Sequence, residues 1–170
     1  MKLLVVRHAI AEERDVFAKT GLTDDLRPLT TRGRERMELG ARGLVSIAGK
    51  LDVLATSPFT RAAETASILA AAFGDLNPVP LGALEPGGDY EQLASWLKAL
   101  GADQRAAIVG HEPHLSGFVS RLLGSRGSLV QLKKGSACLL TVAPSVGVGS
   151  GVLRWALTPS QLRRLGKDED

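Results

Sequence analysis

The sequence predicts a three-layer α/β/α sandwich built on a mainly parallel β-sheet. Short apolar runs of the kind that form buried strands alternate with longer segments of helical periodicity. The chain has 170 residues, of which 44% are apolar and 23% charged, and this is the composition of an ordinary globular domain. These observations predict one domain over residues 1–170, with residues 166–170 expected to form a frayed tail.

The first half of the chain opens on a strand at residues 3–6, the wholly apolar run LLVV. Residues 10–28 are polar and irregular, and a connection of this length is a candidate functional loop or lid. A threonine at residue 30 or 31 can cap a helix that runs to about residue 48, with apolar residues at helical spacing on one face. The next apolar run predicts a strand at 51–55, and the turn after it leads into an alanine-rich helix at about 59–73.

The second half continues the same alternation. A short strand is expected at 78–81, and Asp89 caps a helix that ends near residue 100. The apolar run at 106–109 predicts another buried strand, which is followed by a helix to about residue 123. The remaining expected elements are strands at 136–142 and 152–157, joined by the flexible stretch at 147–151, and a helix that starts near Pro159.

Charge and hydropathy exclude several classes of function. The chain carries 21 Lys and Arg against 18 Asp and Glu, and its longest basic runs are Lys133-Lys134 and Arg163-Arg164. A nucleic-acid-binding domain carries a much denser basic stripe. No apolar run approaches the roughly 18 residues of a membrane span, and the N-terminal run is too short for a signal peptide. We therefore expect a soluble, cytoplasmic protein that binds neither nucleic acid nor membrane. The single cysteine, Cys138, cannot form an internal disulfide, which fits a reducing compartment.

Polar residues stand where three of the expected strands end. Arg7 and His8 follow the first strand, Arg61 lies near the start of the helix after the second, and His111 follows the strand at 106–109. The carboxyl ends of parallel strands share one edge of a sheet, so these side chains are expected to converge. Guanidinium groups bind phosphate in a bidentate manner, and a histidine can attack phosphorus or stabilise its oxygens. Each residue alone has an ordinary structural explanation; for Arg61 it is a solvated side chain paired with Glu64 or Glu35.

The stretches around these residues carry a family resemblance. VVRHA at 5–9, TSPFTRAAETA at 56–66 and VGHEPHLS at 109–116 resemble the histidine phosphatase superfamily, whose fold is also called phosphoglycerate-mutase-like. LRPLTTRG at 26–33, together with LEPGGD at 84–89 and LTPSQL at 157–162, is similar to the SixA subfamily of phosphohistidine phosphatases. The matches span nearly the whole chain in the family's order.

The resemblance implies a role for each matching residue. His8 would be the catalytic nucleophile that becomes phosphorylated on nitrogen. Arg7 and Arg61 would bind the phosphoryl oxygens, and His111 would complete the pocket as a hydrogen-bond donor. Water would then attack the phosphorylated His8 in line and release phosphate, with no metal and no other cofactor. The implied partner is a phosphorylated protein carrying phosphohistidine, or a small phosphorylated substrate.

The sequence departs from the superfamily pattern in two places. The usual Arg-His-Gly reads Arg-His-Ala, with Ala9, a variant familiar in the SixA-like branch. Many members supply a general acid from the region after the third strand, and Glu85 is the best candidate for it here. The alternative interpretation is that Glu85 is an ordinary loop glutamate before Pro86. A phosphohistidine needs little help from an acid, because its leaving imidazole titrates near ~6.5. The weak acid signal thus favours phosphohistidine or activated esters over alkyl phosphates.

The same residues are compatible with other functions. His111 and His114 are three residues apart with Pro113 between them, unlike the i, i+4 spacing of a helical zinc pair, so no metal site is expected. One alternative is a phosphoglycerate-mutase-like phosphotransferase, for which the chain looks short. Another is a phospho-ligand binding module that has lost catalysis.

Overall fold

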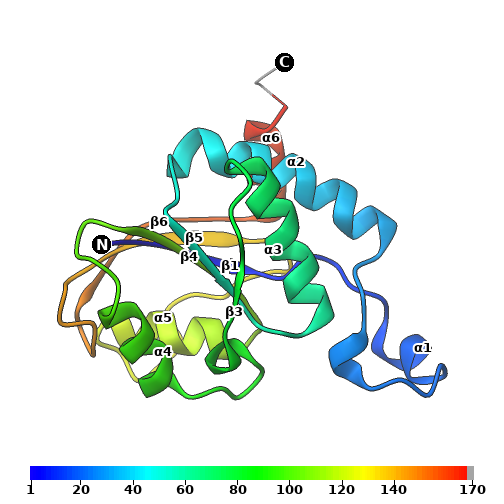
Figure 1. Ribbon diagram of the computed structural model, residues 1–170, viewed down its shortest axis with the longest axis horizontal. Coiled ribbons are helices and arrows are strands. Elements are labelled where there is room, and N and C mark those ends of the chain that lie inside the picture. Colours follow the sequence, from blue (N-terminus) through cyan, green and yellow to red (C-terminus); the bar gives the residue numbers. More distant parts are fainter. Residues whose placement is uncertain (168–170) are drawn as a thin grey trace.

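A computed structural model describes residues 1–167 of the chain (Figure 1). Within them, one six-stranded sheet has the strand order β3-β2-β4-β1-β5-β6. The first four strands pair in parallel, whereas β5 is antiparallel to both β1 and β6. The strands are β1 (Lys2–Arg7), β2 (Val53–Thr56), β3 (Val79–Pro80), β4 (Arg105–Gly110), β5 (Ala137–Val142) and β6 (Gly151–Leu157).

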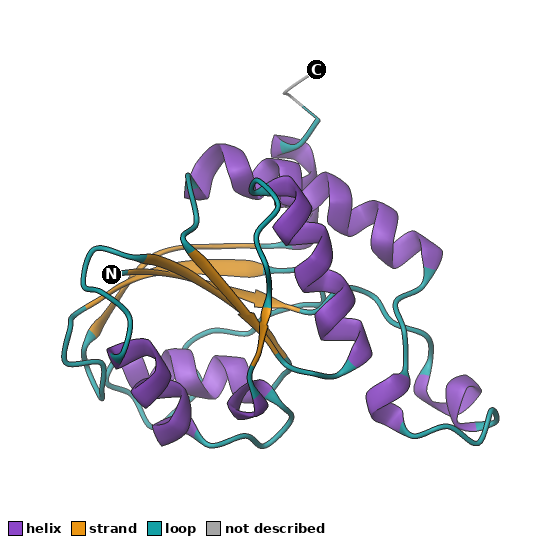
Figure 2. Cartoon of the chain, in the orientation of Figure 1, coloured by secondary structure: helices purple, strands orange, loops and turns teal. Residues whose placement is uncertain are grey.

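Helices cover both faces of the sheet (Figure 2). One face carries α2 (Thr31–Ala48), α3 (Thr60–Ala72) and α6 (Pro159–Leu165), and the other carries α4 (Tyr90–Lys98) and α5 (His114–Leu122). The alternation of side chains in β1 divides the core between the two faces. Leu4 and Val6 belong to the apolar cluster beneath α2 and α3, whereas Leu3 and Val5 belong to the cluster beneath α4 and α5. The α/β/α sandwich with a mainly parallel sheet is confirmed.

Side-chain caps fix where three of the helices begin. The Thr30 hydroxyl accepts a hydrogen bond from the Gly33 amide at 2.9 Å and starts α2. The Asp89 carboxylate accepts from the first amides of α4, as its position before the helix predicted. Thr158 and Gln161 form a reciprocal capping box at the start of α6.

The segment 10–28 is more regular than its sequence indicated. It contains the short helix α1 (Arg14–Ala18) and the 3-10 helix η1 (Asp24–Leu26), and it protrudes beside one end of the sheet (Figure 1). Neither helix has a buried residue, so neither produces the apolar periodicity by which helices are recognised in a sequence. The prediction of an irregular loop was wrong for this reason.

The C-terminal end of the described chain is packed rather than loose. Gly166 is buried, and a β-carbon built on it would lie 2.0 Å from the carbonyl oxygen of Leu39 in α2. The fraying expected over residues 166–170 therefore does not begin at Gly166. Residues 168–170, the rest of the expected tail, lie outside the described part of the chain.

Helices α2 and α6 approach each other closely at Gly43. A β-carbon there would lie 2.1 Å from the carbonyl oxygen of Leu162, whereas at Gly40 the nearest atom would be 3.9 Å away. We expect Gly43→Ala to lower the free energy of unfolding by about 2 kcal/mol, because the backbone of α6 must move. Gly40→Ala is the matched control and should raise stability by up to ~1 kcal/mol through helix propensity. Urea titration measures both, and equal effects would contradict the close approach at Gly43.

Candidate active site

Three parallel strand ends meet at one edge of the sheet. Arg7 at the end of β1 pairs in register with Gly110 at the end of β4, and the amide of His8 donates to the Gly110 carbonyl at 3.0 Å. The amide of Ser57 donates to the Val109 carbonyl at 2.9 Å. These bonds set the residues that follow each strand around a cavity of about 230 Å³. Its walls are formed by Arg7, His8, Glu13, Arg14, Arg27, Arg61, Pro86, His111, Glu112 and Lys134.

The four residues singled out from the sequence, Arg7, His8, Arg61 and His111, all line this cavity. Three of them are almost completely buried, with exposed fractions of 5% for His8, 3% for Arg61 and 3% for His111. The fold thus brings together residues that are more than a hundred positions apart in the chain.

The His8 imidazole is held in one tautomer. Its Nδ1 lies 2.7 Å from the carbonyl oxygen of Ala9, and because a carbonyl only accepts, Nδ1 carries the hydrogen. The other nitrogen, Nε2, is left with a free lone pair. Burial lowers the pKa of His8 to about 3; the bond to Ala9 opposes this shift, and the charges of Arg61 and Arg7 add to it. At neutral pH the ring is therefore uncharged and able to act as a nucleophile.

The His111 imidazole is oriented through Ser57. Its Nε2 lies 2.9 Å from the Ser57 hydroxyl oxygen, which already accepts from the amide of Phe59 at 3.3 Å. When the Ser57 hydroxyl donates to Nε2, the imidazole hydrogen resides on Nδ1, the nitrogen left without a partner. Burial, followed by the neighbouring His8 and Arg61, lowers the pKa of His111 to about 3. The two histidine rings lie 5.1 Å apart between centroids, and the Phe59 ring packs edge-on against His111.

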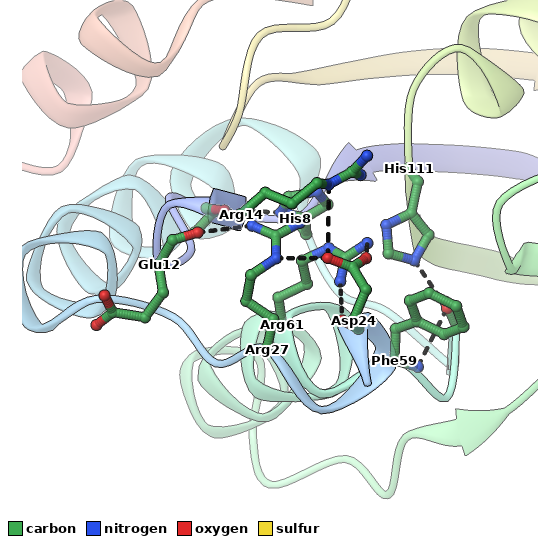
Figure 3. A network of polar contacts seen from close by, with 10 residues as sticks. His8, Glu12, Arg14, Asp24, Arg27, Phe59, Arg61 and His111 are labelled. Atoms are coloured by element: carbon green, nitrogen blue, oxygen red, sulfur yellow. Dashed lines mark hydrogen bonds and ion pairs between the residues drawn. The ribbon is translucent and has the colours of Figure 1, made fainter. Parts of the chain in front are cut away.

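The Asp24 carboxylate organises three of the arginines at the cavity (Figure 3). Arg61 donates to the Asp24 carbonyl at 2.8 Å and pairs with its carboxylate at 3.2 Å. Arg27 pairs with the same carboxylate at 2.8 Å and Arg14 at 3.6 Å. Burial raises the pKa of Asp24, but the hydrogen bond from Arg27 and the charges of all three arginines outweigh it and hold the pKa below its usual value. The partner of Arg61 is thus Asp24, whereas Glu64 pairs with Arg34 at 2.5 Å.

Unpaired buried polar atoms concentrate at this cavity. Within residues 1–167, the buried side-chain nitrogens and oxygens without a hydrogen-bond partner are Arg7 Nε, Arg61 Nε, His111 Nδ1 and Glu112 Oε1. All four belong to residues that line the cavity, and three of them are donors. Each such group costs about 1–3 kcal/mol when it is left unsatisfied. A ligand rich in acceptor oxygens, such as a phosphoryl group, would satisfy the three donors.

Glu85 and His114 do not line the cavity. Glu85 follows the 3-10 helix η2 (Gly82–Leu84), and it is the next residue, Pro86, that lines the cavity. The role of Glu85 as an acid stays a prediction. His114 is buried outside the cavity, where Nε2 lies 2.9 Å from the Ala83 carbonyl and the ring stacks on Tyr90 at 4.7 Å.

Sequence reasoning missed other lining residues. Glu13 and Arg14 belong to the protruding segment, which has no periodic signal. Glu112 immediately follows His111, so its position beside a candidate residue was the available signal. Its Oε2 accepts a short hydrogen bond from the Ser116 hydroxyl, while Oε1 remains without a partner.

Residues 1–167 show neither a metal-binding cluster nor a membrane-spanning helix. Residues 1–167 contain no group of three or more His, Cys, Asp and Glu side chains placed to hold a metal ion. Among the helices in this range, none has the length and apolarity to cross a bilayer.

The family model for the histidine phosphatase superfamily (branch 1) matches residues 3–96. An uncharacterized protein of Picosynechococcus is 34% identical over 157 residues, which cover 91% of this chain and 88% of the relative. The chain belongs to the histidine phosphatase superfamily. Another relative of this histidine phosphatase is the phosphohistidine phosphatase SixA of Escherichia coli, 26% identical over 170 residues that cover 96% of this chain and 97% of SixA.

Solved structures confirm the phosphoglycerate-mutase-like fold of this histidine phosphatase. The protein histidine phosphatase SixA complexed with tungstate superposes with a TM-score of 0.82 at 24% identity, covering 95% of this chain and 99% of SixA. A phosphoglycerate mutase from Plasmodium falciparum gives a TM-score of 0.63 at 20% identity, covering 91% of this chain and 88% of the mutase.

Two of the buried histidines, His8 and His111, predict a pH-dependent stability. An unfolded histidine titrates near ~6.5, whereas the pKa of His8 and that of His111 are both about 3 in the folded protein. Between these values the unfolded chain binds protons that the folded one does not. The contribution of these histidines to the free energy of unfolding should therefore be fully present above about pH 6.5. It should be lost as the pH falls toward 3, by at most about 1.4 kcal/mol per pH unit for each histidine. NMR titration of the imidazole resonances tests this, and either ring titrating between pH 6 and 7 would contradict it.

Proposed function

We propose that this histidine phosphatase is a metal-independent phosphohydrolase that works through a phosphorylated His8. The observation that carries the proposal is the neutral, tautomerically fixed His8 imidazole beside a cavity with three unpaired buried donors. The expected substrate is a phosphohistidine on a protein or a small phosphomonoester.

In the first step, the phosphoryl oxygens accept hydrogen bonds from Arg7, Arg61 and His111. The Nε2 lone pair of His8 attacks phosphorus, so a P–N bond to His8 forms while the bond to the leaving group breaks. The His8 ring then carries a positive charge, which the Nδ1–H bond to the Ala9 carbonyl stabilises. The electron pair of the broken bond departs with the leaving group, which takes up a proton.

In the second step, a water molecule attacks phosphorus in line. The P–N bond breaks, and its electron pair returns to Nε2, which restores the neutral imidazole. The water proton is lost to solvent or stays on the released phosphate. Arg7 and Arg61 stabilise the phosphoryl charge in both steps because their guanidinium groups are held by Leu132 and Asp24 before substrate arrives.

Phosphohistidine is the favoured substrate among the two classes. Its leaving imidazole accepts a proton near ~pH 6.5 and so needs no strong acid, whereas an alkoxide does. Glu85 is not among the residues that line the cavity, so its position adds no support for an acid directed at an alkoxide. The relative from Escherichia coli is named a phosphohistidine phosphatase, in agreement with this choice.

The test is turnover by protein stripped of metal with a chelator. Two substrates are compared: a protein phosphorylated on histidine, and p-nitrophenyl phosphate, whose leaving group needs little protonation. We expect both to be hydrolysed without added metal, and rapid alkaline quench to trap a phosphoenzyme that is labile in acid. Activity that returns only with a divalent metal would contradict the proposal. Transfer to a second hydroxyl compound in preference to water would point to a mutase, and phosphate binding without any phosphoenzyme to a binding module.

Glu85 and Glu112 can be separated as proton donors by the leaving group. If Glu85 is the acid, Glu85→Gln lowers turnover of an alkyl phosphate about 10²-fold, because general acid catalysis contributes this much. Turnover of phosphohistidine should change less than about threefold, since its leaving group is already basic enough to take a proton. Steady-state kinetics on both substrates measures the difference. The same selective loss in Glu112→Gln, with Glu85→Gln unaffected, would refute the role of Glu85.

A further inference from the structure

A second hollow, here called the basic cleft, lies beside the catalytic cavity. It has a volume of about 500 Å³ and is bounded by the end of β1, by α2, by residues 133–135 and by the start of α6. Its charged lining residues are Arg7, Arg36, Lys133, Lys134 and Arg163, and no carboxylate lines it. The two longest basic runs of the sequence, at 133–134 and 163–164, thus both contribute to one surface feature.

The cations of the basic cleft have no ion-pair partner within the described residues. Within residues 1–167, Arg36, Lys133, Lys134 and Arg163 take part in none of the ion pairs. Partial burial, followed by the charges of Arg32 and Arg163, lowers the pKa of Arg36. Cations gathered in this way repel one another, and an anionic ligand would remove that repulsion.

The walls of the basic cleft are apolar between the cations. Met37 is buried, and Ala9, Ile10 and Pro159 line the same hollow. The cations come from four separate segments and surround this apolar surface. Several carboxylates next to an apolar side chain match such a surface better than a single compact anion does.

The basic cleft and the catalytic cavity are adjacent and share two lining residues. Arg7 and Lys134 line both. Because His8 and His111 are buried, a protein substrate must present its phosphoryl group to them on a projecting side chain. The parts of a protein substrate that flank such a side chain would lie over Lys134 and the basic cleft.

We propose that the basic cleft docks an acidic segment of the phosphohistidine protein whose phosphoryl group is being removed. This inference rests on the proposed function for its substrate class. It adds that the enzyme selects substrates in which the phosphohistidine is flanked by carboxylates and an apolar residue.

Binding measurements test the docking independently of turnover. Two labelled peptides carry the same non-hydrolysable phosphohistidine analogue, one flanked by Asp, Glu and Leu and the other by Asn, Gln and Leu. Fluorescence anisotropy at low salt should show that the acidic peptide binds about tenfold more tightly, with a preference that declines as salt is added. The double variant Arg36→Gln/Arg163→Gln should lose this preference and bind the neutral peptide unchanged.

The matched control changes the same charge on the same two helices. Arg42 and Arg164 are exposed on α2 and α6 but do not line the basic cleft, so Arg42→Gln/Arg164→Gln should keep the preference. An equal loss in both double variants, or none in the first, would overturn the docking site. So would tighter binding of an oligonucleotide of the same charge. Failure of the proposed function is seen separately, as intact peptide binding without hydrolysis of p-nitrophenyl phosphate.

Discussion

Replacing His8 with alanine is expected to lower turnover of p-nitrophenyl phosphate and of protein phosphohistidine by at least about 10⁴-fold. The substitution removes the Nε2 lone pair on which the covalent intermediate forms, and no other side chain at the cavity can take its place. The Nε2 of neighbouring His111 is engaged with the Ser57 hydroxyl at 2.9 Å. Stopped assays and alkaline-quench trapping measure the loss of both turnover and phosphoenzyme.

A structural defect is separated from a chemical one by rescue. The alanine variant leaves room for a free imidazole where the His8 ring stood, so added imidazole should restore part of the activity. His114→Gln is the matched control, since His114 is equally buried but bonds only to the Ala83 carbonyl, and its turnover should stay within about threefold. Full activity of His8→Ala without imidazole would refute the mechanism.

Replacing Arg61 with lysine is expected to lower kcat/KM about 10²- to 10³-fold, as the loss of one oriented donor does in other enzymes. Two nitrogens of its guanidinium are fixed by Asp24, which leaves Nε as the buried donor at the cavity. A lysine ammonium keeps the charge but cannot make the two contacts to Asp24 and donate to the cavity at the same time. Inhibition by inorganic phosphate should weaken in parallel, because the same donor binds the product.

The control for Arg61 is an arginine that is also paired with a carboxylate but lies outside the cavity. Arg34 meets this condition through Glu64, and Arg34→Lys should leave kcat/KM within about threefold. Melting temperatures of both variants show whether the fold is kept. Equal losses in the two variants would mean that Arg61 acts on stability rather than on the phosphoryl group.

The sequence predicted the elements that bury an apolar face. The structure contains the four buried apolar residues of β1 and the buried face of α2 around Met37 and Leu44. It also contains the predicted helix caps at Thr30 and Asp89. The residues at the strand ends were also predictable as a group, because parallel strands present their carboxyl ends at one edge. That rule needs only the order of strands and helices along the chain.

The rest of the site depends on contacts that no periodicity records. Segment 10–28 is held by the bridge between Ala11 and Leu29 and by the contacts of Asp24 with Arg61, and its short helices contain no buried residue. The placement of Asp24 among Arg14, Arg27 and Arg61 follows from that anchoring and from charge, not from a pattern in the sequence. Arg61, for example, pairs with Asp24 in this segment and not with Glu64, its neighbour in the sequence.

An enzyme whose pocket binds the anion that it releases as product is prone to product inhibition. Asp24 counters this risk, because its backbone carbonyl and its carboxylate each engage one nitrogen of Arg61 and compete with phosphate for them. On the proposed mechanism, we expect the Asp24 carboxylate to shorten the residence time of phosphate on Arg61, because it is an internal counterion to which Arg61 can return.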